Sequence, residues 1–260
     1  LGELRAELKR QGIERDTYII YMADNGRPFP RCKTRLYDSG IRTPFLIARP
    51  GTIAPAVTDS LISSIDISAT ILELAGAKKD KRIQGVSFAP ILQNPKATVR
   101  DYVFAEHNWH VFQAHERMVR WKDWVLIRNG YPARQNLCME SDPTFPAGRE
   151  LWAMETAGQL QPAQRDIFLK PRPALELYNL RNDPHQLRNL IADKKHAPML
   201  SDLVRVLDRW AEDTADTVPK NPTNDRQDAH GKRTKNHKRG TMPGEERGAT
   251  KINHPGPIKE

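Results

Sequence analysis

Asp24, Asn25 and Lys33 are the side chains whose types and spacing in this sequence could do chemistry together. A carboxylate and an amide carbonyl are hard oxygen ligands of the kind that Ca²⁺ or Mg²⁺ prefers, and Gly26 lets the backbone turn sharply after them. Lys33 adds a mobile positive charge that could hold an anion beside such a cation. Asp-Asn-Gly after a strand is also a common turn, and a single lysine is usually a solvated surface residue, so these simpler interpretations stand beside the metal-site hypothesis.

The elements around these residues place them at the edge of a sheet. The apolar run Tyr18 to Met22 is typical of a buried parallel strand, and open α/β sheets bind ligands outside the carboxyl ends of such strands. Residues Leu1 to Arg10 favour a helix with Leu1, Leu4 and Leu8 on one face. We therefore expect Asp24 and Asn25 at an active edge.

Four ordered blocks extend this pattern along the chain. They are Asp24-Asn25-Gly26 followed by Lys33; Tyr37 to Pro44, close to Tyr-Glu-Gly-Gly-x-Arg-x-Pro; Phe45 to Ala48 with Pro50, Gly51, Asp66 and Thr70; and Leu177 to Leu190, close to Leu-Tyr-Asp-Leu-x-x-Asp-Pro-x-Glu-x-x-Asn-Leu. With these blocks the chain resembles the sulfatase family of the alkaline-phosphatase-like superfamily.

The departures from the family pattern leave the metal pair unchanged. They are Asp38, Ser39, Asn179 and Gln186, which stand where the pattern has Glu, Gly, Asp and Glu. Three shorter matches resemble the heparan N-sulfatase (N-sulfoglucosamine sulfohydrolase) branch: Asp24 to Pro30, Pro143 to Phe145, and Thr156 to Gly158.

The resemblance implies an α/β fold with three parts. Residues 1–100 would be the C-terminal part of an alkaline-phosphatase-like mixed sheet sandwiched by helices. Residues 101–218 would form a small α+β subdomain, an antiparallel sheet with a packed C-terminal helix. Residues 219–260 would be a basic disordered tail.

The resemblance also implies a reaction, the hydrolysis of a sulfate ester or sulfamate in a sulfated sugar or glycosaminoglycan. Asp24 and Asn25 would ligate Ca²⁺, with Mg²⁺ as the alternative, and Lys33 would bind the sulfate and offset charge near the leaving group. Family members of this type in bacteria are often periplasmic or secreted.

The nucleophile of the family is a formylglycine formed in a Cys-x-Pro-x-Arg or Ser-x-Pro-x-Arg motif, and this motif is missing here. Neither Cys32 nor Cys138 has Arg four positions later, and Ser141 has Phe145 there. We infer that the chain lacks the N-terminal half that would carry the formylglycine, and we expect no turnover of a sulfated substrate by this polypeptide alone.

The other elements read mainly as structural. We predict a helix over Asp59 to Ala75 closed by Gly76, in which Asp66 and Thr70 satisfy neighbouring polar groups. We also predict a hairpin over 118–127, a strand over 175–180, and a helix over 199–210 whose apolar residues pack against the sheet. Substrate-specific loops are expected in the polar region 128–173.

A strand beginning at Tyr102 to Ala105 leads into Glu106-His107-Asn108-Trp109-His110. His107 and His110 could donate to sulfate oxygens while Trp109 stacks on a sugar ring. The alternative is a partly buried polar loop. Arg42 is expected to brace the turn at Asp38.

Charge and composition limit the remaining classes. The 260-residue chain carries a net charge of +9, and no apolar run approaches the length of a membrane span. Its two cysteines give neither a disulfide framework nor zinc spacing. The basic cluster Lys232 to Arg239 is by default a solvated tail; loose attraction to a sulfated polyanion is the intermediate case, and nucleic-acid binding is not expected without aromatic partners.

Three functional hypotheses therefore compete. The first is a sulfatase fragment acting on sulfated sugars. The second is a phosphodiesterase or phosphatase of the same superfamily, with a Ser or Thr nucleophile. The third is a non-catalytic chain that binds polyanions through its basic surface, for which Asp24 and Lys33 would be dispensable.

Overall fold

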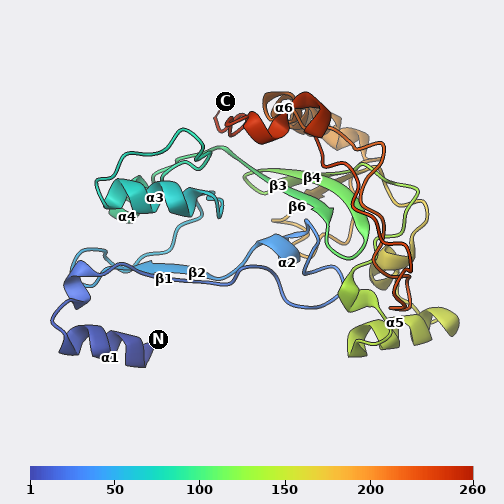
Figure 1. Ribbon diagram of the computed structural model, residues 1–260, viewed down its shortest axis with the longest axis horizontal. Coiled ribbons are helices and arrows are strands. Elements are labelled where there is room, and N and C mark those ends of the chain that lie inside the picture. Colours follow the sequence, from blue (N-terminus) through green and yellow to red (C-terminus); the bar gives the residue numbers. More distant parts are fainter. Residues whose placement is uncertain (260) are drawn as a thin grey trace. The chain divides into compact units, whose positions relative to one another are not determined.

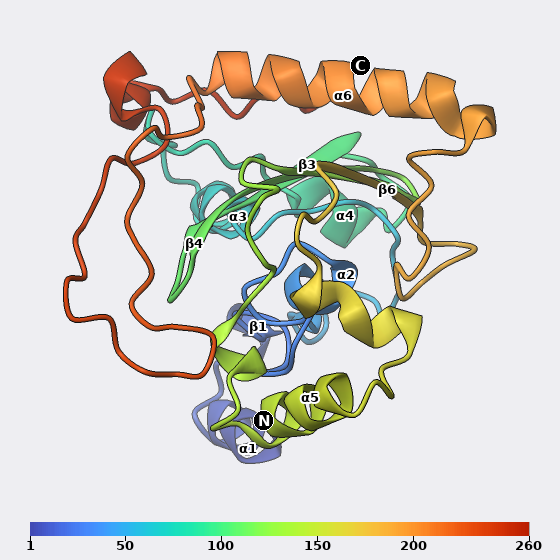
Figure 2. The same cartoon turned by 90° about the vertical axis from the view of Figure 1, so that its right-hand side faces the viewer.

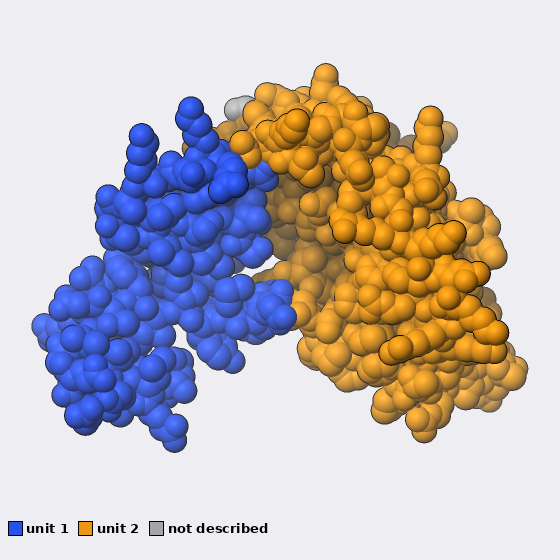
Figure 3. Space-filling view, viewed as in Figure 1, with its two compact units in different colours: residues 1–24, 43–100 blue, residues 25–42, 101–260 orange. Residues whose placement is uncertain are grey.

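The computed structural model of the chain describes residues 1–259 and divides into two units. Unit 1 comprises residues 1–24 and 43–100, and unit 2 comprises residues 25–42 together with the chain from Asp101 onward (Figures 1 and 3). The backbone therefore passes between the units three times, after Asp24, Arg42 and Arg100. The domain limits expected from the sequence, at residues 100 and 218, remain predictions.

Unit 1 holds two short strands and three α-helices. Its elements are α1 (Gly2–Arg10), a 3₁₀ helix (Glu14–Asp16), β1 (Ile19–Met22), β2 (Phe45–Ala48), α3 (Asp66–Leu74) and α4 (Ala89–Gln93). The core of this unit contains the buried side chains of Phe88, Ile91 and Val99, and alternate residues of β2, Phe45 and Ile47, pack against them.

The pairing of β1 corrects one prediction. The expected parallel strand is instead antiparallel to β2, with Ile20 opposite Ile47 and Met22 opposite Phe45. Of its four residues only Ile19 is buried. The apolar run correctly predicted a strand, but within residues 1–259 its sheet has only two strands, so Tyr21 and Met22 are exposed.

The predicted helix over 59–75 begins later than expected, at Asp66. The buried Asp66 carboxylate accepts hydrogen bonds from the backbone N–H groups of Ser63 and Val86, both at 2.8 Å. These bonds hold the preceding residues in a loop, which overrides their helical apolar spacing. The predicted end is confirmed, because Gly76 adopts φ +65° and its N–H donates to the Glu73 carbonyl.

Asp66 and Thr70 have the structural role predicted for them. Arg100 Nε donates to the Asp66 carboxylate at 3.0 Å. The Thr70 hydroxyl donates to the Asp66 carbonyl and accepts from the Phe88 N–H. Both side chains therefore join α3 to the chain that follows it.

Unit 2 is built on a four-stranded antiparallel sheet in the order β3-β4-β5-β6. Its strands are β3 (Tyr102–Trp109), β4 (Gln113–Trp121), β5 (Trp124–Asn129) and β6 (Leu175–Asn179). The predicted hairpin is confirmed, since Trp121 pairs with Trp124 across a two-residue turn in which Lys122 has φ +52°. The predicted small antiparallel sheet is thus present.

The two faces of this sheet bury different side chains, as the two-residue period of a strand requires. Val119 and its neighbours pack under the long helix α6 (Ala197–Asp213), which confirms the predicted role of that helix (Figure 2). Met118, one residue earlier, packs on the opposite face with Leu36 and Tyr37, next to the short helix α2 (Asp38–Ile41). Residues 25–42 are therefore anchored to the sheet through its second core.

The remaining elements of unit 2 are short except for α5. They are α5 (Pro146–Thr156) and the 3₁₀ helices Met139–Ser141, Pro162–Phe168, Lys194–His196, Glu245–Arg247 and Ala249–Lys251. None of the helices within residues 1–259 combines the length and apolar character needed to cross a bilayer.

The segment 219–259 differs from the predicted disordered tail. Asn224 and Lys238 are joined by two hydrogen bonds, one between backbone groups and one to the Asn224 side chain, and the Arg226 N–H donates to the Val111 carbonyl at 2.8 Å. Composition suggested disorder because the segment has little apolar content, but polar backbone and side-chain bonds hold it instead. Glu260 lies outside the described residues.

Candidate functional site

Asp24 and Asn25 lie just after the end of β1. The Ala23 N–H donates to the Pro44 carbonyl at 3.2 Å, so the chain stays paired up to this point. Asp24 is exposed and belongs to unit 1, whereas Asn25 is half-buried and begins unit 2. The sequence correctly predicted that both follow a strand.

Gly26 is required by a close backbone approach. Its N–H donates to the Gly40 carbonyl at 2.9 Å, and a Cβ at this position would clash with the Ser39 carbonyl oxygen and the Gly40 Cα. The Asp-Asn-Gly sequence therefore turns the chain tightly against α2. Arg42, directly after this helix, reaches the Asp38 carboxylate with Nη1 at 3.5 Å, as expected.

The metal hypothesis was tested against the donors present. Within residues 1–259 neither the Asp24 nor the Asn25 side chain makes a hydrogen bond or ion pair, so both oxygens are available. However, Ca²⁺ takes six to eight oxygen ligands, and the described residues contain no group of three His, Cys, Asp or Glu side chains that could hold a metal. The pair fits part of a hard-cation site and cannot complete one.

Lys33 lies on a loop whose far end is fixed in the core of unit 2. The Lys33 N–H donates to the Arg27 carbonyl at 3.1 Å, and its half-buried side chain has no carboxylate partner within residues 1–259. Two residues later, Arg35 is buried and pairs with Glu116 at 3.1 Å. Arg35 therefore fixes the position of the loop that carries Lys33.

His107 belongs to β3, opposite Glu116 on β4. The strand continues to Trp109 with an irregularity after His107, so residues 106–109 are not the polar loop that we considered as the alternative; His110 lies just beyond the strand. His107 Nδ1 lies 2.8 Å from a Glu116 carboxylate oxygen. Its Nε2 is buried and has no partner within the described residues.

Glu116 is the centre of a buried charge network. Arg172 donates to it at 2.7 Å, in addition to Arg35 and His107. Burial alone would raise the pKa of Glu116, but Arg35 and Arg172 outweigh it and hold this pKa well below its usual range. The carboxylate is therefore ionised and accepts from His107 Nδ1, which leaves the buried Nε2 as the ring atom without a partner among the described residues.

His110 completes a group of side chains in unit 2. Burial lowers the pKa of His110; Glu140 opposes this effect, whereas Lys33, His107 and Arg226 add to it. The neutral ring is therefore favoured, unlike the charged form that we expected to donate to sulfate. His110 Nδ1 and the Oε2 atom of the buried Glu140 both lack hydrogen-bond partners among the described residues.

The structure thus brings Lys33, His107 and His110 into one unit and adds Glu116, Glu140 and Arg226, which sequence reasoning missed. Glu116 is one of three consecutive polar residues, His115 to Arg117, but β4 also contains Gln113 and Arg120, so residue type alone did not single it out. Arg226 was missed because we expected its segment to be disordered.

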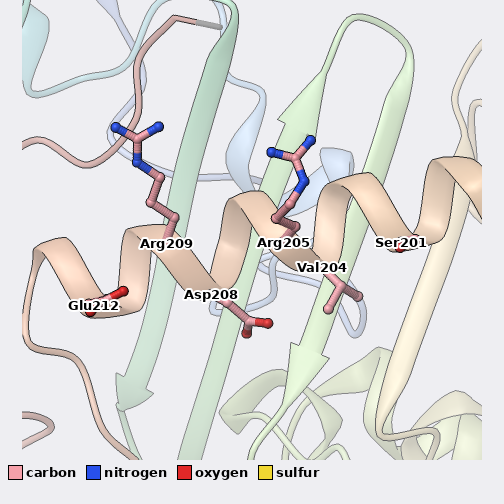
Figure 4. A pocket seen from close by; sticks show the side chains of 6 residues that line it. All are labelled: Ser201, Val204, Arg205, Asp208, Arg209 and Glu212. Carbon is pink, nitrogen blue, oxygen red and sulfur yellow. The ribbon is translucent and has the colours of Figure 1, made fainter.

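Among the described residues, a hollow along α6 contains no histidine or buried carboxylate of the kind found near Lys33 and His110 (Figure 4). The helix alone lines it, with Ser201, Val204, Arg205, Asp208, Arg209 and Glu212. The side chains of Arg205 and Arg209 point to one side and Asp208 to the other, and Asp208 pairs with Arg128 at 2.7 Å. This surface reads as an ordinary solvated helix face.

Comparison with solved structures defines the class of fold. A structure described as a complex with its substrate D-glucosamine-2-N,6-O-disulfate matches with a TM-score of 0.59 and 21% identity, over 81% of this chain and 37% of that chain. The fold is the C-terminal part of the alkaline-phosphatase-like α/β architecture, as predicted.

The sequence comparisons then give the family. The sulfatase family model matches residues 1–77. An ulvan-active sulfatase of Formosa agariphila is 31% identical over 215 residues, which are 81% of this chain and 35% of the relative. The N-sulphoglucosamine sulphohydrolase of Homo sapiens is 28% identical over 233 residues, 83% of this chain and 45% of the relative. Residues 1–77 therefore match the sulfatase family, and the chain spans less than half the length of these two relatives. Sulfatases generally use a metal ion and a formylglycine.

Proposed function

We propose that this chain is the C-terminal portion of a sulfatase that acts on a sulfated sugar. The proposal is supported most by one observation: Glu116 binds His107 through Nδ1 and leaves its Nε2 without a partner within the described residues, and both Lys33 and His107 act on the pKa of His110. Two relatives, the ulvan-active sulfatase and the N-sulphoglucosamine sulphohydrolase, match 81% and 83% of this chain. We also propose that the whole protein is exported, to the periplasm or the medium.

Each of these side chains would have a distinct task. Lys33 would supply a positive charge to the sulfate oxygens and stabilise charge that develops toward the leaving group. His107 would face the substrate through Nε2, which accepts a hydrogen bond in the neutral ring and donates one in the charged ring. Neutral His110 would bind a sugar hydroxyl.

Asp24 and Asn25 would supply two oxygen ligands to a divalent cation, which we propose is Ca²⁺ with Mg²⁺ as the alternative. Bound there, the cation would neutralise and polarise the sulfate. The further ligands and the formylglycine would come from sequence that this chain does not contain, so we assign no step to them.

The test uses the full-length gene product and a defined sulfated glycan. Lys33→Met is expected to lower kcat/KM by about 10²- to 10³-fold, the typical effect of removing one charge-stabilising donor. Lys194→Met, an exposed lysine on another part of unit 2, is the matched control and should change nothing. Equal activity of the two variants would contradict the proposed role of Lys33.

The choice of substrate separates the two enzymatic hypotheses. A sulfatase should release sulfate from p-nitrophenyl sulfate or a sulfated glycan, while a phosphatase or phosphodiesterase of the superfamily should prefer the corresponding phosphate ester. A higher kcat/KM for the phosphate ester than for the sulfate ester would contradict the proposed sulfatase reaction.

A further inference from the structure

Residues 224–239, here called the basic arm, are fixed to the turn between β3 and β4. Trp109 Nε1 donates to the Asn224 carbonyl at 3.0 Å, and the Gln113 N–H donates to the Asp225 carboxylate at 2.6 Å. The Arg226 N–H donates to the Val111 carbonyl at 2.8 Å. The arm is part of the long loop drawn in orange-red beyond the end of α6 (Figure 2).

Trp109 also contacts residues near both ends of the arm, Arg226 and His237. The ring of His237 stacks on it, with centroids 5.4 Å apart and planes at 23°. The guanidinium carbon of Arg226 lies 4.8 Å from the centre of the same ring. Because Trp109 follows His107 by two residues on β3, the arm begins close to the candidate site.

The acidic side chains of the arm have hydrogen-bond partners, whereas its basic side chains form no ion pairs within the part of the chain that the structure describes. Its two acids are occupied: Asp225 binds Gln113 and Arg134, and Asp228 accepts from the N–H groups of its own turn. Within residues 1–259 six basic side chains of the arm are exposed and form no ion pair: Arg226, Lys232, Arg233, Lys235, Lys238 and Arg239. The buried arginines Arg35, Arg100, Arg117 and Arg172, by contrast, are all paired with carboxylates.

We propose that the basic arm binds a sulfated polysaccharide chain next to the sugar that Lys33, His107 and His110 hold. The inference rests on the proposed function and extends it, because it makes the substrate a polymer rather than a free monosaccharide. A row of unpaired cations attracts a polyanion of regular charge spacing mainly through counterion release.

A sulfated polysaccharide fits this surface better than a nucleic acid does. Residues 224–239 contain no Phe, Tyr or Trp, so the arm offers no aromatic platform on which successive bases could stack. Arg226, the first basic residue of the arm, contributes to the lowered pKa of His110. The arm therefore begins at Trp109 with a cation that also acts on His110, one of the residues assigned to the sulfated sugar.

The experiment compares binding of heparin oligosaccharides, from disaccharide to decasaccharide, by the intact chain and two charge-matched variants. The arm variant replaces Lys232, Arg233, Lys235, Lys238 and Arg239 with Gln. The control variant replaces five exposed bases elsewhere that have no ion pair within residues 1–259, namely Lys78, Lys81, Arg165, Lys194 and Lys195. Circular dichroism checks that both variants fold.

The arm variant should bind the decasaccharide at least tenfold more weakly than the wild type, and the slope of log K against log salt should fall by about 2 to 4. Affinity for the disaccharide should stay within twofold. Three results would overturn the proposal: an equal loss in the control variant, an equal loss for the disaccharide, or tighter arm-dependent binding of a single-stranded oligodeoxynucleotide than of the decasaccharide.

Sulfate release by the full-length protein separates this inference from the proposed function. Arm-dependent decasaccharide binding without sulfate release would support the arm and contradict the function. Equal release from the decasaccharide by wild type and arm variant, at equal KM, would support the function and contradict the arm.

Discussion

The buried carboxylate of Glu116 provides the sharpest test of how the site is held. Its side chain is 3% exposed and accepts from Arg35 at 3.1 Å, Arg172 at 2.7 Å and His107 at 2.8 Å. Both arginines are themselves buried. Replacing Glu116 with Gln preserves the shape but leaves two guanidinium charges without their carboxylate.

Removing one partner of a buried ion pair typically costs about 3 to 5 kcal/mol. We expect Glu116→Gln to lower the free energy of unfolding at pH 7 by that amount, measured by urea denaturation. Glu106→Gln is the control on β3, because the Glu106 side chain is half-exposed and its distance to Arg117, 3.6 Å, is longer than those at Glu116. It should cost less than about 1 kcal/mol.

The pH dependence gives a second measurement on the same variant. The pKa of Glu116 is lowered in the folded chain, so the unfolded chain binds the proton more readily. The stabilisation is therefore present above the unfolded pKa of about 4.3 and is lost as the pH falls toward the folded value. Glu116→Gln should flatten this acid limb. A cost no larger than that of Glu106→Gln, with an unchanged acid limb, would refute the assigned network.

Three further results are expected. In the full-length protein, Asp24→Ala should abolish metal-dependent sulfate release, and unchanged turnover in the presence of a chelator-titrated metal series would exclude the ligand role. Gly26→Ala should destabilise the chain by about 2 kcal/mol or more in urea denaturation, since its Cβ meets backbone, while Gly2→Ala, where nothing lies within 4 Å, should be neutral or slightly stabilising. The pKa of His110 is lowered, first by burial and then by nearby cations, so the folded state resists protonation of this ring. The free energy of unfolding should therefore decline as the pH falls through the unfolded pKa of about 6.5, and His110→Gln should reduce this decline. An identical pH profile for the wild type and His110→Gln would contradict the assignment.

Local patterns in the sequence predicted most of the secondary structure. The strand predicted over 175–180 is β6 (Leu175–Asn179), and the hairpin at Lys122 turns where its apolar flanks required. These features depend on neighbouring residues, so spacing is sufficient to find them. The start of α3 was missed because the Asp66 carboxylate binds Ser63 and Val86, and the partner twenty residues away cannot be read from spacing.

The candidate site was predictable only in part for the same reason. Lys33 and His107 were identified from residue type and resemblance, and their roles remain predictions. The buried link between Arg35 and Glu116 spans 81 positions in the sequence, and nothing local marks it. The ordered basic arm was missed because its bonds are to residues more than 100 positions earlier, at Trp109, Val111 and Gln113, whereas composition reports only its lack of apolar residues.

The discontinuity of unit 2 limits how the protein can be dissected. A truncated polypeptide beginning at Asp101 would contain all four strands of the sheet but neither Leu36 nor Tyr37, so one apolar face would be uncovered. It would also leave Glu116 without the guanidinium of Arg35. Such a deletion product should be prone to aggregation, and a synthetic peptide of residues 25–42 supplied in trans should rescue its solubility by complementation.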